Sequence, residues 1–195
     1  MSINRNFIIH KPYGFLSQFI TNQTKRKNKK LLGELLFDFP EGTMAIGRLD
    51  EDSEGLLLLT TDGKLSEQVR SNKVEKEYYV QVDGIIDETA VKKLQDGVEI
   101  SVNGKKYTTK PSKSSIIEDP GFPERSRKVR DDRHGPTSWV SVIISEGKFR
   151  QVRKMTAAAG FPTLRLVRIR IGNILLGELS SGQVIEVDDN FASLF

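Results

Sequence analysis

Residues 47–55 (GRLDEDSEG) place carboxylates, a serine and glycines directly before a run of four leucines. The acids imitate the start of a calcium-binding loop, but its later ligand positions fall on leucines and on Thr61, where that loop requires a bidentate Glu. The pattern therefore argues against calcium. Two interpretations remain: Asp50 and Ser53 merely close a tight turn, or Asp50 lies at the edge of the core as a nucleophile or base, tuned by partial burial and a cation.

A tyrosine on the strand expected over residues 77–82 is a second candidate. Because side chains alternate along a strand, Tyr78 shares the inward face with Val80 and Val82. Of the two neighbouring tyrosines, Tyr78 is therefore the one expected to face inward, either toward a site or as an ordinary core tyrosine. Lys76 has the same parity, so it either supports the site or ends the strand with its ammonium in solvent.

Residues 149–159 have the spacing of an amphipathic helix, in which Val152, Met155 and Ala159 form the apolar stripe. Arg153 falls at the border of this stripe, from where its guanidinium can reach inward. The alternative is a surface arginine.

The expected strand at residues 163–171 alternates apolar and cationic side chains. Arg168 and Arg170 share one face, which suits phosphates or neighbouring acids. Leu166 fits a core position.

The formal net charge of +4 conceals two acid-free basic blocks. The first block, residues 1–33, carries Arg5, Lys11, Lys25, Arg26, Lys27, Lys29 and Lys30. The second block, residues 147–177, carries Lys148, Arg150, Arg153, Lys154, Arg165, Arg168 and Arg170. The rest of the chain is therefore acidic overall. A single basic run is most often a solvated cationic face, but two acid-free blocks far apart in the sequence favour a protein that binds a polyanion such as nucleic acid.

The composition excludes several classes of chemistry. With no Cys and two His, the chain offers no disulfide, thiolate zinc site or cysteine nucleophile, and little for a histidine metal site. It has no apolar run of the roughly 18 residues that a membrane span needs, and its start does not resemble a signal peptide. We therefore expect a cytoplasmic protein without metal or cofactor, in which carboxylates, hydroxyls and cations do the chemistry.

Strands and helices interleave along the 195 residues, which predicts a mixed α+β fold. Strands are expected at 7–10, 56–60, 77–82, 138–145 and 163–171, and helices at 31–36, 63–70 and 149–159. A further helix is capped by Asp87 and ends at Gly97, and a hairpin over 98–107 turns at Asn103-Gly104. Residues 112–137 are expected to form a long loop.

Four ordered motifs resemble the RsuA-like family of ribosomal RNA pseudouridine synthases. They are the turn KPYG at 11–14, the signature GRLD at 47–50 with the leucine run behind it, the strand KEYYV at 76–80, and EGKFRQVRKM at 146–155. Within the family, PTSW at 136–139 and GFPTLRL at 160–166 are most similar to the large-subunit synthase E subgroup.

The resemblance implies roles for individual residues. Asp50 is the catalytic aspartate, which cleaves the N-glycosidic bond of a flipped-out uridine by attack at C1′ or by removal of the 2′ proton. Arg48 fills the vacated space, Tyr78 stacks on the uracil, and Arg153 pairs with Asp50. The implied substrate-binding residues are Arg48, Lys76, Leu166 and Lys11. The expected RNA-binding residues are Lys25, Arg26, Lys27, Lys29, Lys30, Lys148, Arg150, Arg168 and Arg170.

The resemblance also implies the architecture and the partner. It predicts one catalytic domain over residues 1–195, with a mainly antiparallel sheet in two lobes around a catalytic cleft. Many relatives begin with a small S4 RNA-binding domain, for which the KPYG turn at residue 11 leaves no room. RNA capture is then expected from the catalytic domain, above all from residues 21–30 and the insertion 112–137. The expected partner is 23S ribosomal RNA, free or in an assembling subunit, bound by a monomer.

Two other functions compete with this prediction. A ribosome-assembly protein that binds RNA without catalysis would need the same basic blocks but no carboxylate at a pocket. A carboxylate-pair hydrolase of nucleosides or sugars would need a partner acid for Asp50, and no comparable motif supplies one.

Overall fold

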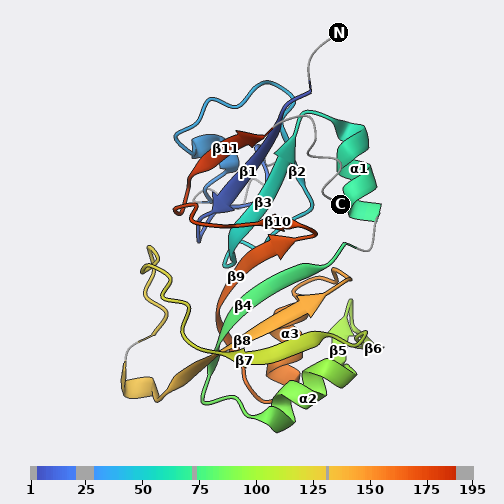
Figure 1. The fold of residues 1–195 in the computed structure, drawn as a ribbon, viewed down its shortest axis with the longest axis vertical. Coiled ribbons are helices and arrows are strands. Elements are labelled where there is room, and N and C mark those ends of the chain that lie inside the picture. Colours follow the sequence, from blue (N-terminus) through green and yellow to red (C-terminus); the bar gives the residue numbers. More distant parts are fainter. Residues whose placement is uncertain (1–3, 21–28, 72–73, 131, 188–195) are drawn as a thin grey trace. The chain divides into compact units, whose positions relative to one another are not determined.

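The computed structural model describes residues 4–20, 29–71, 74–130 and 132–187 (Figure 1). The chain forms two compact units: unit 1 consists of Met1–Val74 and Arg168–Phe195, and unit 2 consists of Glu75–Val167. Both units are built on mainly antiparallel sheet with few helices. Across the described ranges, every helix is too short or too polar to span a membrane.

Among its described residues, unit 1 contains a sheet and one α-helix. Its elements are β1 (Asn6–Lys11), η1 (Leu32–Glu34), β2 (Met44–Ile46), β3 (Glu54–Thr60), α1 (Gly63–Ser71), β10 (Ile174–Leu175), β11 (Val184–Val187) and the end of β9 (Thr163–Ile171). The strand β1 pairs with β11 on one edge and with β3 on the other. The strand β2 pairs with the last residues of β3.

All seven residues of β3 are buried, as the run of four leucines predicts for a strand covered on both faces. The end of β9 lies very close to the start of β3: a Cβ on Gly55 of β3 would stand 2.3 Å from the carbonyl oxygen of Arg168 in β9. Gly55 also has φ +102°, which favours glycine. The buried strand β3 therefore begins immediately after the acidic turn and fixes that turn at its end.

In the part of unit 2 that the structure describes, a sheet and a hairpin are combined with two α-helices. Its elements are β4 (Lys76–Asp83), α2 (Glu88–Asp96), β5 (Glu99–Val102), β6 (Lys105–Thr108), β7 (Lys113–Ile117), η2 (Asp132–His134), β8 (Thr137–Ile144), α3 (Gln151–Ala158) and the start of β9. In the sheet, β4 pairs with β8 and β8 pairs with β7, while β5 and β6 form a separate hairpin. Helix α2 contacts β7, and α3 contacts β5.

Several local predictions are confirmed. The carboxylate of Asp87 accepts the Ala90 N–H at the start of α2, and the helix ends at Gly97 as expected. Asn103 and Gly104 both have positive φ in the β5–β6 turn, which is the turn geometry that Asn-Gly favours. The strand predicted at 163–171 has those bounds.

The predicted helix at 31–36 is wrong: only a single 3₁₀ turn, Leu32–Glu34, forms there. The next residue, Leu35, is extended, and Phe37 and Phe39 then pack edge-on against Phe7 of β1. These aromatic contacts with a distant strand override the local helical spacing.

The segment 112–137 is not one long loop, because it contains β7 and the short η2. Strand β7 pairs with β8 from Lys113 opposite Ile143 to Ile117 opposite Trp139. The helix predicted from residue 149 begins at Gln151, because Arg150 takes the left-handed conformation with φ 53°.

Candidate active site

In unit 1, the KPYG turn contacts the acidic turn that holds Asp50. The Gly14 N–H donates to the Glu51 carbonyl at 2.8 Å, although the two residues lie far apart in the sequence. The Ser53 N–H donates to the Asp50 carbonyl at 3.0 Å and closes the turn. Asp50 is half-buried there, between buried Leu49 and buried Ser53. Asp50 therefore lies in a closed turn at the edge of the core, which fits both sequence interpretations, and its catalytic role stays a prediction.

A second pair of hydrogen bonds fixes the backbone just before Asp50. The Ser17 hydroxyl donates to the Leu49 carbonyl at 2.8 Å and accepts the Leu49 N–H at 2.9 Å. Both groups are buried, so each bond also satisfies a backbone group that water cannot reach. Ser17 thus holds the position of Asp50 from a separate segment of the chain.

Lys11 is fully buried behind this turn. Its Nζ donates to the carbonyls of Pro12 and Phe15 at 2.8 Å each, and to that of Glu51 at 3.4 Å. Burial lowers the pKa of Lys11 to about 7, although the charges of Glu54, Asp52 and Asp50 oppose that shift. Lys11 was predicted to bind substrate. The structure instead directs its ammonium at backbone carbonyls of the KPYG turn, of Phe15 directly after it, and of the acidic turn.

Two arginines predicted for RNA contact differ in exposure. Arg48, two residues before Asp50, is exposed, as a residue that enters RNA must be. Arg168 is only 4% exposed, and its Nε donates to the Leu56 carbonyl at 2.8 Å. Because phosphates are reached from the surface, burial argues against Arg168 as a phosphate contact. Its guanidinium supports the start of β3 instead.

In unit 2, the parity argument for Tyr78 is confirmed. Tyr78, Val80 and Val82 are buried on β4, whereas the residues between them are partly exposed. Lys76 has the same parity and is partly exposed at the strand start. Leu166 is buried on β9, which fits the core position expected for it.

The start of α3 is organised around Glu146. Its carboxylate accepts the Tyr107 hydroxyl at 2.6 Å, the Lys110 N–H at 3.0 Å and the Gln151 amide at 2.5 Å. Partial burial acts to raise the pKa of Glu146, but these hydrogen bonds outweigh burial and lower it. Arg153 lies half-buried on the first turn of α3, at the border of the buried stripe, as predicted.

The structure describes only some of the cations that were predicted to bind RNA. Lys29 forms an ion pair with Glu51, and the Lys30 ammonium lies 5.5 Å from the ring centroid of Phe15. Lys148 is exposed, and Arg170 donates to the Gly172 carbonyl at 2.9 Å. Lys25, Arg26 and Lys27 lie outside the described residues.

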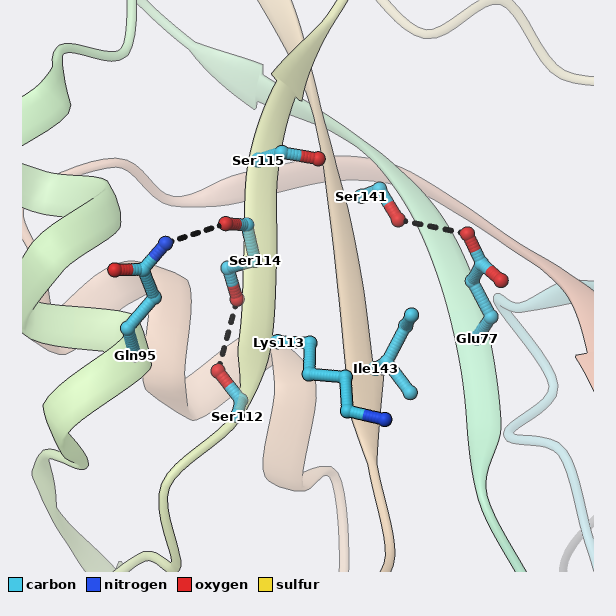
Figure 2. A pocket seen from close by; sticks show the side chains of 8 residues that line it. All are labelled: Glu77, Gln95, Ser112, Lys113, Ser114, Ser115, Ser141 and Ile143. Atoms are coloured by element: carbon cyan, nitrogen blue, oxygen red, sulfur yellow. Dashed lines mark hydrogen bonds between the residues drawn. The ribbon is translucent and has the colours of Figure 1, made fainter.

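A depression of about 500 Å³ in unit 2 is lined by residues of β4, β7 and β8 and by Gln95 of α2 (Figure 2). Glu77 and Ser141 line it and share a 2.9 Å hydrogen bond, and strand alternation places Glu77 opposite Tyr78. Ser112 and Ser114 lie at its α2 side, joined at 2.8 Å. The depression is therefore separate from the predicted site residues of unit 2.

A comparison of the chain with known protein families gives the same family as the four sequence motifs. A model described as RNA pseudouridylate synthase matches residues 5–158, which is most of the chain. The chain belongs to the RNA pseudouridine synthase family. It is thus an isomerase that converts uridine in RNA to pseudouridine, as the motifs predicted.

Individual relatives agree with this membership. A Vibrio parahaemolyticus protein described as ribosomal large subunit pseudouridine synthase E is 45% identical, over 94% of this chain and 74% of the relative. A Xanthomonas campestris protein of the same description is 43% identical, over 93% of this chain and 94% of the relative. A crystal structure of pseudouridylate synthase matches with a TM-score of 0.78 at 28% identity, over 100% of this chain and 75% of that one. The predicted family and fold are therefore confirmed, whereas the cleft between lobes and the monomeric state stay predictions.

Within this pseudouridine synthase, sequence reasoning missed the supports of the site. Ser17 gave no local signal, since its partner Leu49 is 32 residues away. Glu54, 2% exposed near Lys11, belongs to the acidic motif, but nothing in the motif told it apart from the surface acids. In the part of the chain that the structure describes, no three His, Asp or Glu side chains gather as ligands for a metal ion.

Proposed function

We propose that this chain isomerises a uridine of large-subunit (23S) ribosomal RNA, with Asp50 as the catalytic carboxylate. Support for the substrate comes from relatives described as large-subunit synthases, one of which shares 43% identity over nearly the full length of both chains. The observation that carries the catalytic role is the Asp50 turn, held by the KPYG turn and by Ser17 at the end of a buried strand. An rRNA substrate implies a cytoplasmic enzyme.

Asp50 suits the first chemical step because the residue is half-buried and its backbone is fixed. Cleavage of the N-glycosidic bond requires either attack of this carboxylate at C1′ or removal of the 2′ proton by it. The freed uracil then rotates and rejoins the ribose through C5. A backbone held on both sides of Asp50 limits the carboxylate to a small range of positions, which favours either step.

The other predicted residues act on the base and on the carboxylate. Tyr78 would stack on the uracil, and Arg153 would pair with Asp50 and keep it ionised. Exposed Arg48 would occupy the space that the extruded nucleotide leaves, because a uridine inside a stacked helix cannot reach a carboxylate. Lys76 and Leu166 would line the base.

Lys11 acts through the turn that it supports. Its three carbonyl partners are Pro12 in the KPYG turn, Phe15 directly after that turn, and Glu51 in the acidic turn, so the ammonium links the two turns next to Asp50. We therefore assign Lys11 to positioning of the catalytic turn.

Pseudouridine mapping of large-subunit RNA tests the proposal. RNA transcribed without modifications is incubated with wild type, with Asp50→Asn, or with Asp52→Asn, which removes a carboxylate two residues away. We expect wild type and Asp52→Asn to modify the same uridine, and Asp50→Asn to lower the rate by at least about 10³-fold, within the range of about 10² to 10⁴ typical of a general base.

Two results would contradict the proposal separately. An unmodified RNA after incubation with wild type, both as free RNA and as assembling subunits, would refute the large-subunit substrate. Modification by Asp50→Asn at the wild-type rate would refute the role of Asp50 while leaving the substrate in place.

A further inference from the structure

The loop 146–150 displays an aromatic ring on the surface of unit 2. Phe149 is 67% exposed, and among the large apolar side chains that the described part of the chain exposes, it is the one aromatic residue. A phenyl ring left in water forfeits the free energy that its burial would supply. A single exposed apolar residue is ordinary in itself, so the groups around the ring decide whether it marks a binding contact.

The backbone around Phe149 is fixed in a way that keeps the ring outside. Arg150 takes the left-handed conformation, which is uncommon for a residue with a side chain. Buried Gln151 accepts the Lys148 N–H at 2.9 Å through its Oε1, and its own N–H donates to the Lys148 carbonyl at 3.1 Å. Gln151 also donates to Glu146. Hydrogen bonds thus fix Lys148 and Gln151 on either side of the Phe149–Arg150 pair, and the Phe149 ring is exposed between them.

Cations accompany the ring. The Lys154 ammonium lies 5.4 Å from the centroid of Phe149 and donates to the Ser101 carbonyl at 2.7 Å, so it is held in place from β5. The Lys148 ammonium lies 5.1 Å from the centroid of Tyr107. An exposed ring flanked by positive charges matches a strand of nucleic acid, whose bases offer π-faces and whose phosphates offer negative charge.

We propose that Phe149 is a base-stacking residue: an unpaired base of the RNA substrate stacks on its ring, and Lys148 and Lys154 contact adjacent phosphates. The proposal rests on the proposed function, because it takes the same RNA as the ligand, and it adds a contact outside the reacting uridine. Phe149 therefore acts on binding, so its loss raises KM more than it lowers kcat.

The test measures the Kd for a protein-free transcript of large-subunit RNA at one fixed salt concentration. We expect Phe149→Ala and Phe149→Leu to weaken binding about 5- to 150-fold, the range that one stacked base supplies, and Phe149→Trp to retain it. The leucine variant keeps an apolar side chain without a π-face. Ile85→Ala, which removes a similarly exposed apolar side chain of unit 2, serves as the control and should bind as wild type.

A fluorescence readout separates stacking from catalysis. The chain has one tryptophan, Trp139, which is 6% exposed, so an indole introduced by Phe149→Trp reports on the surface. The comparison uses two proteins: Asp50→Asn with Phe149→Trp, and Asp50→Asn alone. RNA should quench the emission of the first protein and leave the Trp139 emission of the second unchanged.

The failures of the two proposals are distinguishable. Wild-type Kd in Phe149→Ala together with unquenched Phe149→Trp would overturn stacking, even if the enzyme modifies its RNA. A defect confined to assembled subunits would also overturn it, because the ring would then contact a ribosomal protein. Quenching without any modification by wild type would instead refute the proposed activity.

Discussion

At the residue scale, Lys11 shows how burial changes the role of a charged side chain. Its motif suggested a substrate contact, yet its ammonium is enclosed and donates to three backbone carbonyls. A protonated amine in this position bears a desolvation cost, which nearby Glu54 and Asp52 only partly offset. Protonation of Lys11 therefore lowers the stability of the folded protein relative to the unfolded chain, and loss of the proton relieves this cost.

Lys11 gives the stability a dependence on pH. An unfolded lysine keeps its proton up to about pH 10.5, whereas folded Lys11 releases it above about pH 7. Between these values the unfolded state binds more protons, so the contribution of Lys11 to the free energy of unfolding rises with pH, by up to about 1.4 kcal/mol per pH unit. Urea unfolding from pH 6 to 10 should show the stability of wild type relative to Lys11→Met growing above pH 7. Parallel curves for the two proteins would contradict this expectation.

At the scale of elements, the contact between β3 and the end of β9 depends on Gly55. A Cβ there would stand 2.3 Å from the carbonyl oxygen and 2.7 Å from the nitrogen of Arg168, at a φ that disfavours side chains. We expect Gly55→Ala to lower the free energy of unfolding by more than about 3 kcal/mol, because backbone on both sides must shift. Thermal unfolding measures the loss.

Gly63→Ala is the matched control for that substitution. Gly63 is the first residue of α1 and has nothing within 4 Å of an added Cβ, so the change should alter stability by no more than about 1 kcal/mol. Equal melting temperatures for the two variants would show that the close approach of β9 at Gly55 does not affect the free energy of unfolding.

The elements that could be predicted are those with short-range causes. The Asp87 cap acts within three residues, and the Asn103-Gly104 turn depends on its own two dihedral pairs. The helix expected at 31–36 failed because Phe7 draws the following chain onto β1, a contact across about thirty residues. Strand β7 was missed because polar Ser114 and Ser115 gave no strand pattern and pair with β8, over twenty residues further on.

The residues of the candidate site also fall into two groups: those placed by a local sequence pattern and those placed by contacts with distant parts of the chain. Strand parity placed Tyr78 correctly, and the position of Asp50 before a leucine run placed it at the edge of the core. The burial of Lys11 and Arg168 depends on turns and strands distant in the sequence, which no local pattern contains.

At the scale of the whole molecule, the basic blocks are less available to RNA than their sequence suggests. Lys11 and Arg168 are buried, and Lys29 is paired with Glu51. Lys30 and Lys148, in contrast, are exposed. The electrostatic contribution to RNA binding should therefore come from a subset of the fourteen cations.

Salt dependence tests the first block. Replacing Lys25, Arg26, Lys27, Lys29 and Lys30 by Gln should weaken RNA binding and flatten the plot of log Kd against log salt concentration. The slope should fall by about 0.7 to 0.9 for each phosphate that the variant no longer neutralises. Five replacements outside the blocks, at Lys64, Arg70, Lys92, Lys93 and Lys113, should change the slope less. An unchanged slope in the first variant would contradict the assignment.

The division of unit 1 into two stretches of chain also affects the order of folding during synthesis. Unit 2 is one uninterrupted segment, but β1 lacks its partner β11 until residues 184–187 have been made. About 170 residues separate the two strands, and translation at roughly 5–20 residues per second adds them in about 10 to 35 s. Throughout that interval one edge of β1 is open to pairing with other chains. A chaperone that shields this edge would be most useful before β11 emerges.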